Sequence, residues 1–256
     1  MSRLNALPES LQASLNQRSL LKVIAGLNNF DKSSVEKIAW AAGRGGADLL
    51  DVACDPSLVE IAREASKLPV CVSAVDPELF PPAVSAGASM IEIGNFDSFY
   101  SQGRFFDAAE VLLLTRQTRE LLPEVVLSVT VPHTLPFGEQ SQLAIDLILS
   151  GADLIQTEGG TSAEPLSPGI QGLIEKAVPT LSATKMISNA LIDSQANVPI
   201  ITASGLSEVT VPMAIAVGAS GVGVGSLVNR LDNQLEMLAA IRSLRESLQV
   251  KITSTL

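Results

Sequence analysis

The sequence is poor in cysteine and in positive charge, and both shortages limit what the protein can be. Its 256 residues include two cysteines, Cys54 and Cys71. Two thiols form no disulfide framework, so reduced cysteines in a cytosolic protein are expected. The 17 basic residues face 27 acidic ones, which gives a net charge of −10 and argues against nucleic acid or an anionic membrane as a partner. A small phosphorylated ligand stays compatible, because local dipoles can hold it.

Long apolar segments and a secretory leader are also missing. The first residues, MSRLNALPESLQ, lack a cationic start followed by an apolar run, so no signal peptide is expected. No stretch has the length and unbroken apolarity of a membrane span. We therefore expect a cytoplasmic protein whose 46% hydrophobic residues supply a large core.

What the sequence does contain is a regular alternation of short apolar strands and helices. Such alternation is typical of parallel βαβ units whose strands are buried on both faces. Eight units favour a closed (β/α)8 TIM barrel over an open sheet. A short helix from Glu9 to Asn16, with Leu11 and Leu15 one turn apart, is expected to close the bottom. The expected strands are 20–25, 48–53, 70–75, 89–94, 125–131, 153–157, 198–202 and 221–225.

One domain is expected over residues 1–256, with a cap at 1–18 and the barrel at 20–250. Ser207 is a plausible N-cap for a helix at 209–217, and Ser226 is expected to open a last helix that runs to about Val250. Two long loops, 95–104 and 158–169, are long enough to act as lids.

An internal repeat supports the barrel. The segments GADLLD, GASMIE, GADLIQ and GASGVG share one frame, in which a helix-ending glycine and an alanine precede strands 2, 4, 6 and 8. Their sixth positions are Asp51, Glu92, Gln156 and Gly223. Because side chains alternate along a strand, these four share one face. We place them inside, toward the mouth where the ligand binds.

The strongest predicted site is a phosphate cradle after strands 7 and 8. Ser204 and Gly205 follow one strand, and Gly225 and Ser226 follow the next. Backbone N–H groups at two neighbouring helix starts bind phosphate without any cation, and phosphate-binding barrels use this position. The alternative is that these glycines only permit tight turns.

Candidate catalytic groups are Asp51, Glu92, Lys22 and His133. Two carboxyls at one mouth would repel and raise one pKa toward a useful value. Lys22 is expensive inside a strand unless it is paired, so it is either an ion-pair partner or, if neutral, an imine-forming nucleophile. His133, the single histidine, follows strand 5, where it could transfer protons or simply be solvated.

Further residues are expected to line the substrate. No cofactor is predicted, because no ligand spacing demands a metal, although Asp51, Glu92 and Glu158 could hold Mg²⁺. The expected lining residues are Asn28, Gln156, Thr157, Glu158 and Thr202.

Six stretches spread over nearly the whole chain carry a family resemblance: LKVIAGLNNFD, GADLLDVACDP, MIEIGNFDSFY, LSVTVPHTLP, DLIQTEGGTS and ITASGLS. In these stretches the chain resembles the hypothetical chloroplast reading frame twenty-three family of cyanobacteria and algal plastids. The resemblance implies a barrel fold, and a cyanobacterial cytosol or a plastid stroma as the location. It assigns no reaction. The tail is more distantly similar to phosphate-binding barrels such as thiazole synthase, indole-glycerol-phosphate synthase and tryptophan synthase α, with one glycine at Gly205 where two are common.

Two functions are compatible with these residues. The first is an isomerase, lyase or synthase that binds a small phosphorylated metabolite at the mouth and uses acid–base chemistry. The second is a non-catalytic barrel that senses a metabolite or joins an assembly. A homo-oligomer is compatible with either, and fold alone does not decide between them.

Overall fold

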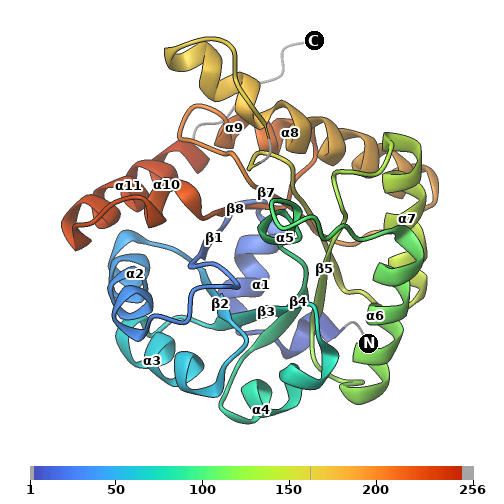
Figure 1. Ribbon diagram of the computed structural model, residues 1–256, viewed down its shortest axis with the longest axis horizontal. Helices are drawn as coiled ribbons and strands as arrows, with labels where there is room; N and C mark the ends of the chain where they lie inside the picture. Colours follow the sequence, from blue (N-terminus) through green and yellow to red (C-terminus); the bar gives the residue numbers. More distant parts are fainter. Residues whose placement is uncertain (1–2, 162, 250–256) are drawn as a thin grey trace.

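A computed structural model describes residues 3–161 and 163–249 and shows a closed barrel (Figure 1). All neighbouring strands are parallel, and they follow sequence order until the last pairs with the first. This confirms the predicted TIM barrel. The strands are β1 (Leu20–Ile24), β2 (Leu49–Ala53), β3 (Val70–Ala74), β4 (Met90–Ile93), β5 (Leu127–Thr130), β6 (Leu154–Thr157), β7 (Ile200–Ala203) and β8 (Gly221–Val224).

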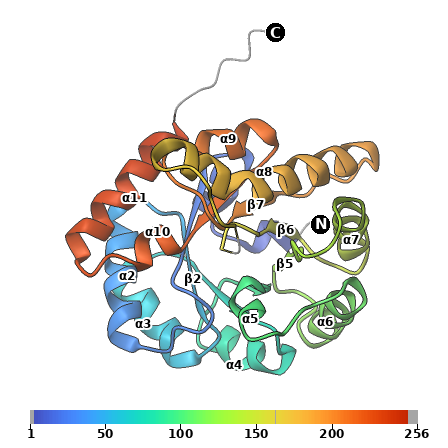
Figure 2. The ribbon, with the colours of Figure 1, turned by 45° about the horizontal axis from the view of Figure 1, so that its top comes forward.

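Helices surround the strands, as Figures 1 and 2 show from two directions. They cover the outward side chains of the strands, which are mostly apolar, as expected for a sheet buried on both faces. The helices after the first strand are α2 (Lys32–Gly45), α3 (Pro56–Ser66), η2 (Pro77–Leu79), α4 (Phe80–Ser85), α5 (Asp97–Tyr100), α6 (Ala108–Leu121), α7 (Phe137–Leu149), α8 (Gly169–Asp193), α9 (Val211–Val217), α10 (Ser226–Asn229) and α11 (Gln234–Leu248).

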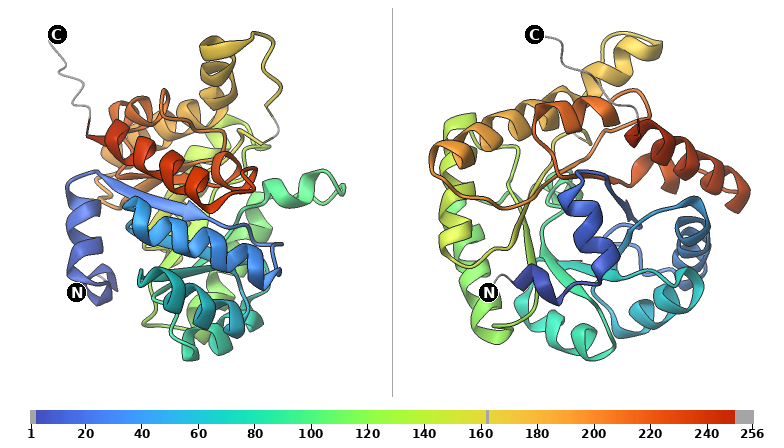
Figure 3. Two further views of the ribbon diagram at one scale, coloured as in Figure 1. Left: turned by 90° about the vertical axis from the view of Figure 1, so that its left-hand side faces the viewer. Right: turned by 180° about the vertical axis from the view of Figure 1, so that it is seen from behind.

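The N-terminal segment closes one end of the barrel. It contains η1 (Arg3–Ala6) and α1 (Glu9–Asn16), and α1 lies across the barrel end in the rear view of Figure 3. Leu7, Leu11 and Leu15 are buried there against the lowest inward side chains of the strands. The predicted cap is therefore confirmed, and an apolar layer seals the end opposite the mouth.

The repeat frame also corresponds to a structural unit. Its four glycines all have positive φ, the conformation that ends a helix with little strain only when no Cβ is present. The φ angles are +90° at Gly46, +104° at Gly87, +105° at Gly151 and +129° at Gly218.

Helix starts near the mouth differ from the prediction. Helix α9 begins at Val211 rather than near Ser207, because the Ser207 carbonyl accepts from Thr210 N and Val211 N in a separate turn, and Pro212 suits the first helical turn. The expected last helix is two helices. A new cap at Asn233, whose side chain accepts from Leu235 N at 2.8 Å, starts α11 after α10 has ended.

The segment between β6 and β7 contains a single long helix, α8. Its first turns project beyond the barrel in the side view of Figure 3. The predicted helix end near Val250 lies outside the described residues. Within the described chain, no helix is both long and apolar enough to cross a membrane.

Candidate functional site at the barrel mouth

A polar network lies inside the barrel around Lys22 on β1. Lys22 Nζ donates to Glu92 Oε2 at 2.7 Å and to Gln156 Oε1 at 3.0 Å, and it lies 3.0 Å from Asp51 Oδ2. Gln156 Nε2 donates to Glu92 Oε1 at 2.6 Å. The even strands therefore bring these three polar side chains together, as the repeat predicts. Of the two roles open for Lys22, the structure contains the ion pair.

The network shares charge between one ammonium and two carboxylates. Burial alone would lower the pKa of Lys22, but Asp51 and Glu92 raise this pKa above its ordinary value. Burial raises the pKa of Glu92, while Lys22 opposes that rise. An imine-forming Lys22 would have to be neutral and would have to leave both carboxylates, so the ion-pair interpretation is the better supported one.

Asn95 separates this network from the mouth. Lys22, Asp51, Glu92 and Gln156 are each at most 1% exposed, and the Asn95 amide makes long hydrogen bonds of 3.3 Å to Glu92 Oε1 and 3.5 Å to Asp51 Oδ2. The prediction that these side chains point inward is correct. They do not line the cavity at the mouth, however, whereas Asn95 does.

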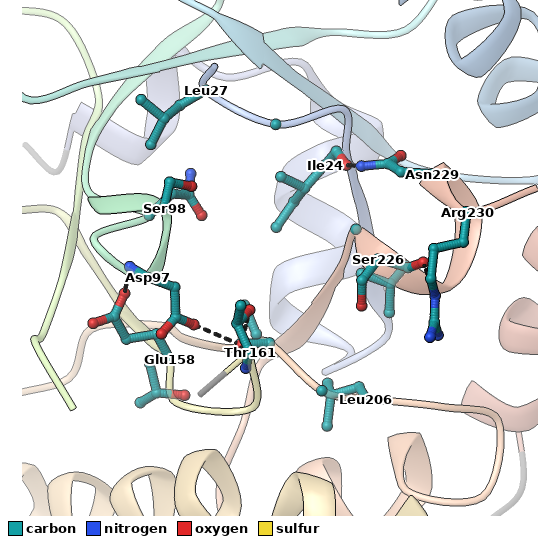
Figure 4. A pocket seen from close by; sticks show the side chains of 18 residues that line it. Ile24, Leu27, Asp97, Ser98, Glu158, Thr161, Leu206, Ser226, Asn229 and Arg230 are labelled. Carbon is teal, nitrogen blue, oxygen red and sulfur yellow. Dashed lines mark hydrogen bonds between the residues drawn. The ribbon is translucent and has the colours of Figure 1, made fainter. Parts of the chain in front are cut away.

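The mouth itself holds a cavity of about 330 Å³, near the lower end of the range for small-ligand sites. Loops after β1, β4, β6, β7 and β8 line it. Figure 4 shows Asp97 and Glu158 on one side, Ser226 and Arg230 on the other, and Ile24 between them. A ligand here would touch residues of both sides.

The four predicted phosphate residues all line this cavity: Ser204, Gly205, Gly225 and Ser226. No described residue accepts a hydrogen bond from their backbone N–H groups. The Ser204 hydroxyl is engaged, because it donates to Asp97 Oδ2 at 2.8 Å. The α9 N-terminus lies several residues beyond Gly205, so of the two helices that follow β7 and β8, α10 is the one that begins directly at the cavity.

Gly205 has a packing role of its own. A Cβ there would lie 2.7 Å from Gly160 Cα and 2.8 Å from the Lys176 carbonyl oxygen, and its φ is +73°. The contacts leave no room for a Cβ, and the positive φ favours glycine. The alternative reading of this glycine, that the turn needs it, therefore has direct support.

Two glycines, Gly223 on β8 and Gly225 directly after it, pack closely against neighbouring residues. A Cβ on Gly223 would lie 2.9 Å from Ala203 Cβ and 3.0 Å from Ile24 Cδ1. At Gly225, with φ −123°, a Cβ would lie 3.2 Å from the Ile24 carbonyl oxygen. The space beside Gly223 is therefore filled by Ala203 and Ile24, and Gly223 does not line the cavity.

A second polar cluster forms the cavity wall opposite Ser226 and Arg230 (Figure 4). Glu158 Oε1 accepts from Tyr100 Oη at 2.6 Å and lies 3.3 Å from His133 Nδ1, which is also 3.4 Å from Asp97 Oδ1. Burial raises the pKa of Glu158, although its hydrogen bonds with His133 and Tyr100 oppose the rise. Burial lowers the pKa of His133, but Glu158 and Asp97 together raise it above its ordinary value. His133 is thus held by carboxylates rather than simply solvated.

Of the other predicted lining residues, Thr157 and Glu158 line the cavity, whereas Asn28 and Thr202 do not. Asn28 is exposed. The Thr202 hydroxyl contacts Thr184 of α8 at 2.6 Å, and the Thr157 hydroxyl contacts Thr180 and Thr184. Both hydroxyls face the helix layer because these threonines occupy the outward positions of their strands.

The three carboxylates considered as Mg²⁺ ligands, Asp51, Glu92 and Glu158, do not lie together. Asp51 and Glu92 contact Lys22, whereas Glu158 lies with Asp97 and His133.

Sequence reasoning missed Asn95, Asp97 and Arg230. Arg230 lines the cavity and donates from Nε to the Ser226 carbonyl oxygen at 2.8 Å. It lies four residues after Ser226, one helical turn away, which is the signal that could have identified it. Asp97 is the fourth residue after β4, but its orientation depends on the loop, and Asn95 has a φ of +59° that no local pattern indicates.

The fold and cavity define the class of protein first: a closed (β/α)8 barrel with a pocket at the carboxyl ends of its strands that has both polar and apolar lining residues. A family model described as "Protein of unknown function (DUF561)" matches residues 5–254, and the chain belongs to that family. A relative from Cyanophora paradoxa, "Uncharacterized protein ycf23", is 46% identical over 225 residues, which cover 88% of this chain and 90% of the relative. The resemblance to that plastid family is confirmed.

Solved structures share the fold at low sequence identity. 3-Hexulose-6-phosphate synthase aligns with a TM-score of 0.62 and 15% identity, covering 89% of this chain and 99% of that chain. Thiamine phosphate pyrophosphorylase from Pyrococcus furiosus aligns with a TM-score of 0.59 and 15% identity, covering 91% and 97%. At this level of identity, the similarity shows a shared fold alone.

Proposed function

We propose that the protein binds a small phosphorylated metabolite in the mouth cavity and acts on it as an isomerase, lyase or synthase. The observation that carries the proposal is that Ser204, Gly205, Gly225 and Ser226 all line one cavity and that their backbone N–H groups have no acceptor in the described chain. Phosphate oxygens are natural acceptors for such groups. Arg230 adds a cation at the same edge.

The position in the fold supports the same ligand. Phosphate-binding TIM barrels place the phosphate at the loops after strands 7 and 8, and the names of the two structural neighbours refer to phosphorylated compounds. The remainder of the ligand would extend across the cavity toward Asn95. The Asn95 amide makes two long hydrogen bonds to Asp51 and Glu92, so it would lie between the ligand and these two proposed proton-transfer groups.

Substituting Ser226 tests phosphate binding with little risk to the fold. Ser226→Asp places a negative charge at the first residue of α10, where it favours the helix but repels a phosphate. Ser226→Asn is the neutral control of the same size. Isothermal titration with inorganic phosphate and with sugar phosphates should show binding about tenfold weaker or worse for the aspartate variant and near wild type for the asparagine variant. Equal affinities in both variants would refute the cradle.

Native mass spectrometry of the purified protein should also reveal a co-purifying phosphorylated compound. Once a substrate is known, Asp51→Asn and Glu92→Gln should each abolish turnover while binding persists. A barrel that binds the compound and turns over no substrate, with or without these changes, would favour the sensing role.

A further inference from the structure

The wall cluster Asp97–His133–Glu158 joins three neighbouring strand ends. Asp97 follows β4, His133 follows β5 and Glu158 follows β6. One donor atom from each lies within 4.8 Å of the other two, and Figure 4 shows the Asp97 and Glu158 side chains next to each other at the cavity wall. The barrel therefore brings one imidazole and two carboxylates, distant in sequence, to a single point.

The spacing of these donors suits a metal ion. His133 Nδ1 lies 3.3 Å from Glu158 Oε1 and 3.4 Å from Asp97 Oδ1. With metal–ligand bonds of about 2.1 Å, two ligands of a tetrahedral site lie roughly 3.4 Å apart. Two of the three edges of a ligand triangle are therefore already in place, and a small rotation of the carboxylates would close the third.

Donors around the cluster hold the two carboxylates in this orientation. The second oxygen of Asp97, Oδ2, accepts from Ser204 Oγ at 2.8 Å, and the second oxygen of Glu158, Oε2, accepts from Asp97 N at 3.1 Å. Tyr100 Oη supports Glu158 Oε1 at 2.6 Å. Each carboxylate thus directs one oxygen to the imidazole while neighbours fix the other, as outer-shell partners do around metal ligands.

The three groups lie in a poorly solvated place. The side chains of Asp97 and Glu158 are 9% and 4% exposed, and that of His133 is 17% exposed. A divalent cation bound through a neutral imidazole would balance two ionised carboxylates there.

We propose that Asp97, His133 and Glu158 bind a divalent transition-metal cation such as Zn²⁺ or Mn²⁺. An imidazole with carboxylates suits these ions better than Ca²⁺, which takes oxygen ligands. Asp97 and Glu158 line the cavity, so a ligand in the cavity can reach the metal. The proposal goes beyond the proposed function, because metal binding requires no phosphorylated ligand.

The single histidine makes the test direct. Untagged protein labelled with [¹⁵N]histidine and stripped of metal is titrated with Zn²⁺, and its ring nitrogens are followed by NMR. All ring signals come from His133, since the chain has one histidine. We expect the Nδ1 resonance to shift and to saturate at one equivalent. A resonance that stays unchanged in excess Zn²⁺ would overturn the proposal without the need for any variant.

Isosteric variants then identify the other ligands. Glu158→Gln and Asp97→Asn should each weaken Zn²⁺ affinity by about tenfold to a hundredfold, measured by the same shift or by calorimetry. Glu139→Gln is the matched control, because Glu139 is an exposed carboxylate six residues after His133. Equal affinities in Glu158→Gln and Glu139→Gln would overturn the proposed ligand set.

Discussion

Two clusters of charged residues lie within the same barrel, and they differ in how their charge is balanced. The interior network holds a lysine between Asp51 and Glu92, and its members are at most 1% exposed. The wall cluster holds two carboxylates around His133 and borders an open cavity. One is a closed unit whose groups satisfy one another. The other places two carboxylates and one imidazole beside the cavity.

The elements that carry the two clusters differ as well. Lys22, Asp51, Glu92 and Gln156 are on strands, whose geometry the closed sheet fixes. Asp97 and His133 are in the segments that follow strands. The polar strand residues complete a network that lies below Asn95. The loop-borne cluster is the one in contact with the cavity.

The strongest test of this contrast is Lys22→Met. Methionine has nearly the volume of lysine but leaves Asp51 and Glu92 as buried carboxylates without a counter-ion. Removing one partner of a buried ion pair costs about 3–5 kcal/mol, so urea unfolding should show a loss in this range. Lys32→Met, at an exposed position, is the control and should change stability little. A loss below about 1 kcal/mol for Lys22→Met would show that the interior network is not closed.

A second test asks whether packing fixes the loops at the mouth. Gly205→Ala combines positive φ with Cβ contacts below 3.0 Å, and we expect a loss of roughly 2–4 kcal/mol. Gly103→Ala has nearly the same φ, +77° against +73°, with nothing within 4 Å of its Cβ. Its loss should be about 1 kcal/mol. Similar losses, measured by urea unfolding, would remove the packing role of Gly205.

Sequence reasoning reached the interior network more completely than the mouth, and the reason is physical. Strand alternation fixes which side chains point inward, so the repeat frame was enough to place Asp51, Glu92 and Gln156 together. The same alternation predicts that Thr157 and Thr202 point outward, so the sequence contains the signal for their orientation too. Loop residues follow no such period. The positive φ of Asn95 and the orientation of Asp97 on α5 depend on contacts across the barrel.

A third test concerns the acid–base balance of the interior. Burial raises the pKa of Glu92 above its ordinary 4.5, so the folded protein holds this proton more tightly than the unfolded chain. Its contribution to stability is present at low pH and is lost as the pH rises from about 4.5 through the raised pKa.

Glu92→Gln removes this titration. The destabilisation that it causes should therefore be largest near pH 4.5 and should decrease as the pH rises, measured by urea unfolding at several pH values. The exposed control Glu139→Gln should show no such trend. A cost for Glu92→Gln that is constant or that grows with pH would mean that Glu92 is ionised throughout and would revise the charge assigned to the interior network.

The smallest expected effect comes from comparing a threonine outside the cavity with one that lines it. Thr202 and Thr184 share a hydrogen bond of 2.6 Å on the α8 side of β7. Thr202→Val keeps the shape but leaves Thr184 with one partner fewer, which should cost about 1 kcal/mol of stability. Because its side chain faces the helix layer, Zn²⁺ and phosphate affinities should stay at wild-type values.

Thr161→Val is the matched variant at the cavity, where the hydroxyl lies 3.2 Å from Ser204 Oγ. It should alter ligand affinity with a smaller loss of stability, because Thr161 is exposed. The reverse result would place β7 in a different register from the one that puts Ser204 at the mouth.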